Sequence, residues 1–558
     1  MERYQKEYRT WCKATGVDAQ TRAELLQIEG NEQEIRDRFY CDLSFGTAGM
    51  RGILGAGSNR MNRYTVRRAT LGFARFLQAR HTAQALQRGV VIAHDNRHMS
   101  REFCMETAGV LAAAGIKAYI FDALRPTPEL SFAVRHLGAI GGVMITASHN
   151  PPEYNGYKLY DEQGCQLMPR YTEPLTKIIN GIEDPLSIRS LTPAQAGELI
   201  EQLSPSVDEA YYRAVMEIRL REVDASSVTV VYSPQHGTGN RPVREVLARC
   251  GYRVIPVTEQ CEPDPDFSGT ESPNPENPAS FARALEYAKR EGADVAIITD
   301  PDCDRLGVVA RRGGEYAQLT GNQSGAILLE YILSTHVERG TLPANAVMCN
   351  TVVTSPLGDR ICARYGVEVQ KTLTGFKFIG DKIHTFEQSG SHHFIFGYEE
   401  SYGCLISPLA RDKDGVQASL LLCEAAAYYK AQGKTLFDVL EELYHAHGYF
   451  EDATTAVTHE GAEGAAKISA MVERLRTAPP RAAGALAVAS LEDYESEQLQ
   501  AMGFPRSNML RFLMQDGSFV AVRPSGTEPK CKYYYCVCGD SREQTAEKLA
   551  AMRRTFEQ

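Results

Sequence analysis

Three segments of the chain repeat one pattern, and this repeat restricts the fold more than any other feature. Each segment has an apolar run, a polar loop, an amphipathic stretch and a glycine-containing turn before a second apolar run. The segments span Val90 to Phe121, Val228 to Val257 and Ala346 to Gln370, with Gly115, Gly251 and Gly366 in the turns. Strands and helices that alternate in this way predict α/β domains with largely parallel sheets.

A further apolar strand follows each copy, and the loops after these three strands differ in chemistry. They read TASHNPP after Ile145, DPDCDR after Thr299 and GYEESYG after Phe396. Ligands gather at the carboxyl ends of strands in α/β sheets, so we expect the three loops to face one cleft.

Length and composition narrow the kind of protein. A chain of 558 residues exceeds what one hydrophobic core sustains, and its length predicts three to five domains. With three repeats and a different region after about Phe450, we predict four domains at 1–205, 206–322, 323–450 and 451–558. The net charge of −10 argues against a nucleic-acid partner. The charged N-terminus does not resemble a secretory signal, and no apolar run reaches the roughly eighteen residues of a membrane span. We therefore expect a cytoplasmic protein with no membrane partner and with reduced cysteines.

The TASHNPP loop contains a candidate nucleophile, Ser148. A serine hydroxyl is a poor nucleophile alone, but His149, the stiff Pro151-Pro152 pair and Lys158 are close in sequence. The alternative is a plain polar turn, because Ser, Asn and Pro are ordinary turn formers. The other loops therefore have to support a functional interpretation.

The DPDCDR loop predicts a metal site. Asp300, Asp302 and Asp304 alternate directly after an apolar strand, so three hard oxygen ligands can point at one divalent cation, and Mg²⁺ fits best. An EF-hand would require glycine in place of Arg305 and glutamate in place of Arg311, so that alternative fails. A solvated acidic turn is the remaining alternative.

Two basic segments predict anion binding. The loop RPSGTEPK, from Arg523 to Lys530, combines a guanidinium, two hydroxyls and a glycine, which suits a phosphate, although a generic Pro-Ser-Gly turn has similar letters. The glycine-rich segment from Asp42 to Asn62 contains Arg51 and Arg60, and we expect it to approach an anion closely.

Two further loops predict contacts with a sugar. Glu399 and Ser401 offer acceptors and a donor for hydroxyl groups, although a buried acidic turn would look the same. Thr374, Gly375 and Lys377 supply a hydroxyl, a flexible backbone and a cation at what is also a plausible helix start. Together, the loops predict phosphoryl transfer on a sugar phosphate, a reaction that depends on positioning and charge neutralisation.

Five stretches in order resemble the α-D-phosphohexomutase family, and within it the long bacterial phosphoglucomutases. They are FGTAGMRG, TASHNPPEYNGYK, DPDCDR, GYEES and RPSGTEPK, and the resemblance covers essentially the whole chain from Asp42 to Asp540. It implies three similar α/β/α domains with mixed sheets, plus a smaller C-terminal α+β domain that resembles the TATA-box-binding-protein fold.

The resemblance also implies a role for each site residue. The enzyme would interconvert glucose 1-phosphate and glucose 6-phosphate through glucose 1,6-bisphosphate, and Ser148 would be the phosphoserine that carries the phosphoryl group. Its catalytic partners would be Arg51, Lys158 and His149. One Mg²⁺ per chain would bind Asp300, Asp302, Asp304 and an oxygen on Ser148. The residues assigned to substrate binding are Arg305, Thr374, Gly375, Lys377, Glu399, Ser401, Arg523, Ser525, Gly526 and Thr527.

The sequence leaves the sugar and the oligomeric state open. Ala48, Cys303 and Tyr398 depart from the simpler family pattern, and mannose or pentose phosphates offer Glu399 similar hydroxyls, so phosphomannomutase and phosphopentomutase are alternatives. A metal-dependent sugar phosphatase would use the same aspartates, and a non-catalytic protein that binds a sugar phosphate is a third class.

Overall fold

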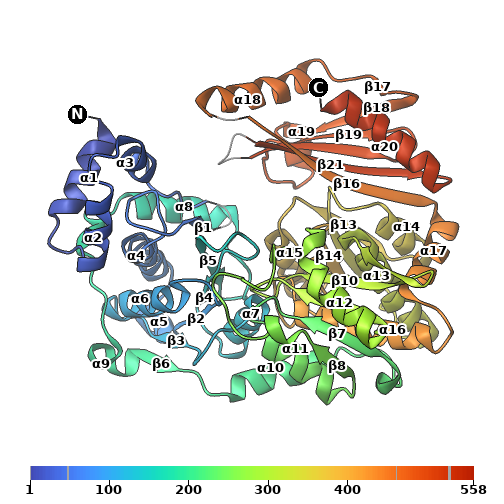
Figure 1. Cartoon of the computed structure of the whole chain (residues 1–558), viewed down its shortest axis with the longest axis horizontal. Coiled ribbons are helices and arrows are strands. Elements are labelled where there is room, and N and C mark those ends of the chain that lie inside the picture. Colours follow the sequence, from blue (N-terminus) through green and yellow to red (C-terminus); the bar gives the residue numbers. More distant parts are fainter. Residues whose placement is uncertain (1, 47–48, 460, 526–529, 558) are drawn as a thin grey trace.

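The computed structural model describes residues 2–46, 49–459, 461–525 and 530–557, and their strands form four sheets (Figure 1). We call the regions around these sheets the first to fourth domains, in chain order. Each of the first three sheets has an apolar cluster on either face, so each sheet is buried between two layers.

The first domain follows three N-terminal helices, α1 (Arg3–Lys13), α2 (Ala19–Gln27) and α3 (Glu32–Phe39). Its strands pair in the order β1-β5-β4-β2-β3-β6, and they are β1 (Met50–Ile53), β2 (Val90–His94), β3 (Ala118–Ile120), β4 (Gly141–Ile145), β5 (Tyr154–Asp161) and β6 (Ile200–Gln202). Its helices are α4 (Arg63–Arg80), α5 (Ala83–Leu86), α6 (Ser100–Ala113), α7 (Thr127–His136), α8 (Pro169–Asn180) and α9 (Pro193–Ala196). The sheet is mixed because β5 runs antiparallel to both β4 and β1.

Strand β2 shows why the first sheet has cover on both faces. All of its residues are buried. Val90 and Ile92 belong to the cluster with α4 and α6, whereas Val91 and Ala93 belong to the cluster with α7. Side chains alternate across a strand, so an uninterrupted apolar run requires an apolar layer on either side.

The second and third domains repeat the centre of the first. The second contains α10 (Ser206–Met216), β7 (Thr229–Ser233), α11 (Asn240–Arg249), β8 (Arg253–Pro256), α12 (Ala282–Glu291), β9 (Val295–Thr299), β10 (Leu306–Arg312) and β11 (Glu315–Leu319). The third contains α13 (Gly321–Glu338), β12 (Ala346–Thr351), α14 (Leu357–Tyr365), β13 (Glu368–Thr372), α15 (Phe376–Ser389), β14 (His393–Tyr398), β15 (Cys404–Leu405), α16 (Gly415–Lys430) and α17 (Leu436–His447). The orders β3-β2-β4-β5, β8-β7-β9-β10 and β13-β12-β14-β15 each have three parallel strands and a final antiparallel one. The predicted threefold repeat is confirmed.

The glycine in each repeat follows a helix and turns the chain into the next strand. Gly115, Gly251 and Gly366 have φ of +75°, +88° and +69°, a region that favours glycine. One strand runs further than predicted, because Gly397 and Tyr398 still pair with β15 and extend β14.

The fourth domain is an antiparallel sheet in the order β16-β21-β20-β19-β18-β17. Its elements are β16 (Tyr449–Thr458), α18 (Gly461–Thr477), β17 (Ala482–Ala483), β18 (Leu486–Asp493), α19 (Glu497–Ala501), β19 (Leu510–Met514), β20 (Phe519–Pro524), β21 (Lys530–Gly539) and α20 (Arg542–Phe556). Helices α18 and α20 share one apolar cluster with the sheet. The fold class predicted from the sequence is therefore confirmed.

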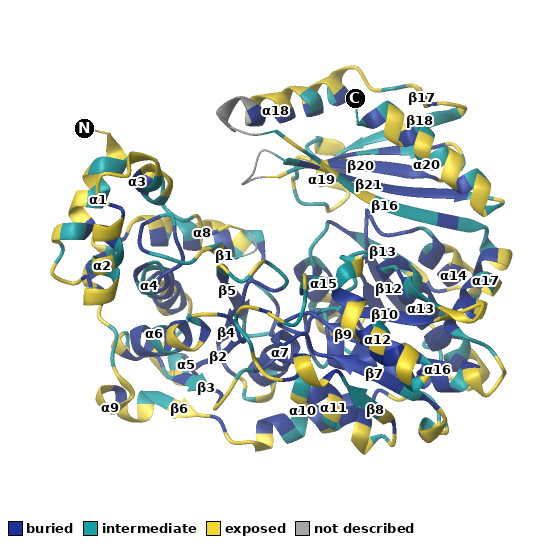
Figure 2. Ribbon diagram, in the orientation of Figure 1, coloured by how far each residue is buried: buried dark blue, intermediate teal, exposed yellow. Residues whose placement is uncertain are grey.

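One apolar core runs through more than one domain. Figure 2 shows that the strands of the sheets are largely buried. Helix α16 follows the third sheet, yet it packs against α11, β9 and β10 of the second domain. Leu421 of α16 shares a cluster with Val246 of the second domain and Ile332 of the third, and the cluster reaches Phe519 in the fourth. The second and third domains therefore share a core. Among the described residues, no helix is both long and apolar enough to cross a bilayer.

Candidate active site

Ser148 lies where the buried strand β4 opens into the TASHNPP loop. Its hydroxyl is buried and donates a hydrogen bond of 2.8 Å to Asp300 Oδ2. His149 Nδ1 lies 3.1 Å from the same hydroxyl oxygen. Burial, with help from Arg305 and Arg51, lowers the pKa of His149 well below its usual range, so its ring is neutral. The serine therefore has both a neutral imidazole and the carboxyl group of Asp300 beside it.

Three aspartates after β9 form a carboxylate cluster next to Ser148. One ligand oxygen from each of Asp300, Asp302 and Asp304 lies within 4.8 Å of the others, and all three side chains are buried. In the described part of the chain, Asp302 Oδ1 and Asp304 Oδ1 have no hydrogen-bond partner. Buried carboxylate oxygens are costly without a partner, so the cluster could hold one metal ion.

Two ammonium groups balance these carboxylates. Lys158 on β5 donates to Asp302 Oδ2 at 2.8 Å and lies 3.7 Å from Asp304 Oδ2. Lys413 Nζ lies 3.2 Å from the same oxygen of Asp304. Burial alone would lower the pKa of Lys158, but the two aspartates outweigh burial and raise it. Lys158 is therefore charged, and it joins the first domain to the second.

Each of the three functional loops holds a non-glycine residue in the left-handed region. The φ angles are +52° at Ser148, +55° at Cys303 and +71° at Tyr402. Such a conformation costs about 1–3 kcal/mol and persists only where surrounding contacts impose it. Strain of this kind is common at functional sites. Among the described residues, Met99, Gln235, His236 and Phe267 also have a positive φ.

A cavity of about 780 Å³ is lined by residues from all four domains. The predicted site residues that line it are Arg51, His149, Arg305, Thr374, Ser401 and Arg523. Lys530 and Lys532 of the fourth domain add to the positive charge of Arg523. The Thr374 hydroxyl is buried without a hydrogen-bond partner among the residues described. The cavity thus connects the serine loop with a second cationic patch that suits an anion.

Two neighbouring glutamates after β14 differ in their contacts. Glu399 is buried, and its carboxylate accepts a hydrogen bond of 2.7 Å from Gly375 N–H. Glu400 lines the cavity, and the hydroxyls of Thr351 and Thr354 donate to its Oε2 at 3.2 and 3.4 Å. Burial, together with nearby Glu399, raises the pKa of Glu400 to about 7. Glu400 is part of the predicted GYEES motif, but the sequence did not single it out.

One prediction about a basic residue is wrong. Arg60 was expected to approach an anion with Arg51, but its guanidinium binds the Asp37 carboxylate and the Asn59 carbonyl oxygen. The carboxylate comes from α3, which lies outside the repeat and was not predicted. Lys377 is buried, and burial lowers its pKa to about 8.

The loop RPSGTEPK, which we predicted to bind phosphate, lies between β20 and β21, and its position between two strands agrees with the sequence. Ser525 N–H donates to the Lys530 carbonyl oxygen at 2.7 Å and joins the two ends of the loop. The predicted residues Gly526 and Thr527 lie outside the described residues. Arg523 is exposed at the cavity, where a bound anion can reach it.

Two residues that touch the aspartates were missed by the sequence prediction. Thr127 at the start of α7 donates to the Asp302 carbonyl oxygen through its N–H at 3.0 Å, and to Asp302 Oδ2 through its hydroxyl at 2.9 Å. Lys413 lies in the segment RDKD after the two-residue strand β15. The available signal for Lys413 was the alternation of opposite charges from Arg411 to Asp414, in the loop that follows β15.

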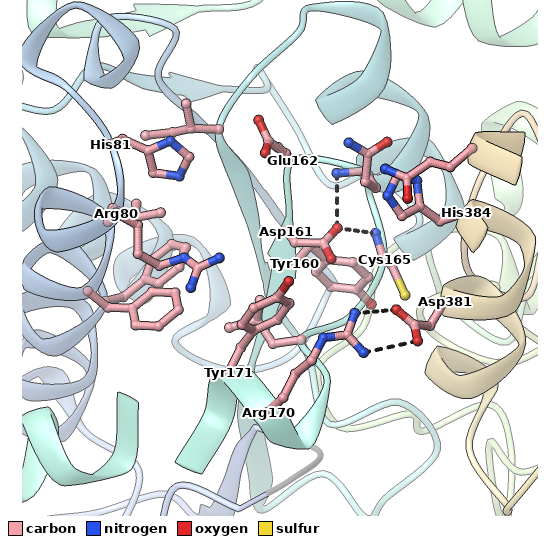
Figure 3. Close-up of a pocket in the computed structure, with 17 residues that line it drawn as sticks. Arg80, His81, Tyr160, Asp161, Glu162, Cys165, Arg170, Tyr171, Asp381 and His384 are labelled. Atoms are coloured by element: carbon pink, nitrogen blue, oxygen red, sulfur yellow. Dashed lines mark hydrogen bonds and ion pairs between the residues drawn. The ribbon is translucent and has the colours of Figure 1, made fainter. Parts of the chain in front are cut away.

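A smaller cavity of about 180 Å³ lies at the seam between the first and third domains (Figure 3). Arg170 of α8 and Asp381 of α15 form an ion pair there, with Nη1 and Oδ2 3.0 Å apart. The Asp161 carboxylate accepts from the N–H groups of Gln163 and Cys165 at 2.9 and 3.1 Å. Arg170, Asp381 and Asp161 therefore have partners within the chain, and we interpret this cavity as a gap in the contact between the first and third domains.

Four known sequence families match the chain in order. They are described as the phosphoglucomutase/phosphomannomutase alpha/beta/alpha domains I, II and III and the C-terminal domain, and they match residues 42–185, 209–314, 320–447 and 470–554. A phosphoglucomutase of Staphylococcus aureus strain USA300 is 38% identical over 529 residues, which is 93% of this chain and 94% of that protein. The phosphoglucomutase of strain N315 is 37% identical over 529 residues, which again is 93% of this chain and 94% of that protein.

Solved structures share the fold over nearly the whole chain. Parafusin, a phosphoglucomutase from Paramecium, has a TM-score of 0.71 at 18% identity and covers 93% of this chain and 94% of its own. A phosphoglucomutase/phosphomannomutase family protein from Burkholderia thailandensis has a TM-score of 0.68 at 18% identity, covering 92% of this chain and 96% of its own.

The site has the parts that phosphoryl transfer requires, because the Ser148 hydroxyl lies beside a cluster that can hold a metal ion, and the next residue, His149, lines a cavity with further cations. Its class is that of a phosphotransferase acting within one substrate. The chain belongs to the phosphoglucomutase/phosphomannomutase family, the α-D-phosphohexomutases. The resemblance predicted from the five motifs is confirmed.

Proposed function

We propose that this chain is a phosphoglucomutase that interconverts glucose 1-phosphate and glucose 6-phosphate. The observation that carries the proposal is one cavity that joins the Ser148 loop to the cationic patch of Arg523, Lys530 and Lys532. A mutase must grip the phosphate that stays on the sugar while the other phosphate reacts, so it needs two anion sites. The curated relatives named phosphoglucomutase support glucose as the sugar.

In this proposal, Ser148 carries the phosphoryl group. It donates the group to the free hydroxyl of the sugar, glucose 1,6-bisphosphate forms and reorients in the cavity, and the other phosphoryl group returns to Ser148. His149 is neutral and 3.1 Å from the serine oxygen. It can therefore accept the hydroxyl proton of Ser148 when the phosphoryl group returns to the serine, and give this proton back when the group leaves. Lys158, paired with Asp302, and Arg51, which lines the cavity, would supply positive charge for the transferring group.

The remaining predicted residues hold the sugar phosphate. Arg523 and Ser525, together with Gly526 and Thr527, would bind the phosphate that does not react. Thr374, Ser401 and Arg305 face the cavity and can bind the sugar or a phosphate oxygen. Glu399 positions Gly375 through its 2.7 Å hydrogen bond, and we assign sugar-hydroxyl binding to Glu400 as well, because it lines the cavity.

One Mg²⁺ per chain fits the aspartate cluster. Asp300, Asp302 and Asp304 would hold it with an oxygen of the phosphorylated Ser148, and the unpartnered Oδ1 atoms of Asp302 and Asp304 are suitable ligands. When bound, the ion supplies charge neutralisation at the phosphoryl oxygens.

The first test separates a mutase from a phosphatase that uses the same aspartates. Purified protein is given glucose 1-phosphate, Mg²⁺ and a trace of glucose 1,6-bisphosphate, and both glucose 6-phosphate and free phosphate are followed. We expect isomerisation with little free phosphate. Rapid phosphate release without glucose 6-phosphate would contradict the proposal.

A second test concerns the carrier and the sugar. Intact-mass analysis should show about 80 Da on Ser148 that is lost when substrate is added. A panel of glucose, mannose and pentose phosphates, each with its matching bisphosphate, should give the highest kcat/KM for glucose phosphate. A preference for mannose or pentose phosphate would retain the chemistry and change the assigned sugar.

A further inference from the structure

Arg97 is a fully buried arginine beneath the serine loop. It lies between β2 and α6, and its side chain has no exposed surface. Its guanidinium donates hydrogen bonds to the backbone carbonyl oxygens of Ser148 at 2.6 Å, Pro151 at 2.7 Å and Tyr154 at 3.0 Å. It also donates to the carbonyl oxygen of Asn150. One side chain therefore holds the backbone of the loop at four points.

The chemistry of the loop explains why an arginine occupies this position. Ser148 has a left-handed backbone, which the loop would not keep without external contacts. A guanidinium presents five N–H donors in a rigid plane, whereas the ammonium of a lysine is a single point with three donors. Asp95 balances the charge, with its Oδ2 3.3 Å from Arg97 Nε, and its Oδ1 accepts from the backbone N–H of Arg97 at 2.9 Å. Asp95 thus contacts both the backbone and the charged group of Arg97.

A residue of the second domain, Phe267, packs against the guanidinium of Arg97. The ring of Phe267 lies 5.0 Å from Arg97 Cζ, and Phe267 is buried with a left-handed φ of +52°. Next to it, Asn96 Nδ2 donates to the Asp264 carbonyl oxygen at 2.8 Å. Arg97 therefore contacts the serine loop of the first domain and an aromatic ring of the second.

We propose that Arg97 is a positioning residue for phosphoryl transfer, and that Phe267 holds it in place. Arg97 fixes the backbone of Ser148 so that its hydroxyl stays 2.8 Å from Asp300, across the boundary between the first two domains. The inference rests on the proposed role of Ser148 as the phosphoryl carrier. It adds a residue that touches neither substrate nor metal and that acts through the loop.

The other two repeats hold their functional loops from the equivalent place in the sheet. After β7, Thr238 donates to the Pro301 carbonyl oxygen through its N–H at 2.8 Å and its hydroxyl at 2.9 Å. At the end of β12, the hydroxyls of Thr351 and Thr354 donate to Glu400. In each repeat, residues at or after the end of β2, β7 or β12 therefore donate hydrogen bonds to the loop after β4, β9 or β14. In the first repeat the donor is a charged side chain, Arg97, whereas in the other two the donors are threonines.

The test compares Arg97→Lys with a matched control, Arg68→Lys. Arg68 on α4 is also a largely buried arginine of the first domain, and it donates to the Ile179 carbonyl oxygen at 3.2 Å and to the Asp42 carboxylate at 2.7 Å. For Arg97→Lys we expect kcat to fall about 100-fold, the effect of a misplacement of about 1 Å, with KM for glucose 1-phosphate within about threefold. Arg68→Lys should lower Tm without changing kcat by more than about twofold.

A second variant covers the case in which Arg97→Lys does not fold. Phe267→Leu keeps an apolar side chain but removes the ring, and we expect kcat to fall about fivefold at constant KM, as for the loss of about 1 kcal/mol of cation–π attraction. Wild-type kcat in Arg97→Lys would overturn the inference, as would equal kcat losses in Arg97→Lys and Arg68→Lys, or a raised KM at unchanged kcat. If Arg97→Lys is unfolded, wild-type kcat in Phe267→Leu would overturn it. Absence of isomerisation in the wild-type protein would instead refute the proposed function.

Discussion

Replacing Lys158 with methionine tests the charge balance of the aspartate cluster. The side chains of Lys158 and Asp302 are 11% and 0% exposed, and their 2.8 Å contact joins two domains. Methionine has a similar length but no charge, so Asp302 would lose its ammonium partner. Breaking a buried ion pair costs about 3–5 kcal/mol. We expect about 3 kcal/mol, the lower end, because the Thr127 hydroxyl still donates to Asp302 and Lys413 still balances Asp304.

The assay is calorimetric unfolding of wild type and Lys158→Met in EDTA and in excess MgCl₂. At about 2–4 °C per kcal/mol, we expect the variant to unfold about 6–12 °C lower in EDTA. Mg²⁺ replaces the missing positive charge in the variant, whereas in wild type it joins a cluster that Lys158 already balances, so the ion should stabilise the variant more than wild type and reduce the difference in Tm. In MgCl₂, isomerisation should fall by at least about 100-fold relative to wild type.

The double variant Lys158→Met with Asp302→Asn is the control. Removing both charges leaves no unpaired carboxylate, so its Tm in EDTA should return to within a few degrees of wild type. If Lys158→Met unfolds at the wild-type temperature in EDTA, or if Mg²⁺ stabilises it no more than wild type, the charge-balance argument is refuted.

Three further predictions concern other parts of the site. Ser148→Ala should show no isomerisation but retain its circular dichroism spectrum, because it loses one hydrogen bond to Asp300, worth about 1.5–3 kcal/mol; substantial turnover would contradict the covalent mechanism. Arg523→Ala should raise KM for glucose 1-phosphate about tenfold or more through loss of a phosphate contact, and an unchanged KM would place that phosphate elsewhere. The pKa of Glu400 is raised from 4.5 to about 7, so the folded state holds this proton more tightly and the resulting stability is lost as pH rises from about 4.5 through about 7. Glu400→Gln should therefore have a higher Tm relative to wild type at pH 8 than at pH 5, and an equal difference at both pH values would contradict the raised pKa.

The repeat made most of the fold predictable. Each copy has a buried apolar strand and a turn whose left-handed backbone favours glycine, as at Gly115. The local sequence was therefore enough to place the strands and turns. The loops after β4, β9 and β14 were also predictable, because carboxyl ends of strands in α/β sheets collect ligands. Ser148 and Asp300 were accordingly identified before their 2.8 Å contact was known.

Contacts between segments that are distant in the sequence could not be predicted. Lys413 reaches Asp304 from a loop after a two-residue strand, which is too short for a periodic signal. Arg60 was assigned to an anion because its actual partner, Asp37, belongs to a helix outside the repeat. Arg97 looked like an ordinary polar loop residue, since nothing in a sequence shows that four carbonyl oxygens will surround one side chain.

The position of α16 determines which pieces of this chain can fold alone. Residues 206–322 contain a complete sheet, but α16 covers one of its faces and lies more than ninety residues further along the chain. A fragment that ends at 322 would expose Val246 and its neighbours to water and should aggregate. A fragment that extends through α17 retains the shared core, and native-state hydrogen exchange should show the second and third sheets opening together as one cooperative unit.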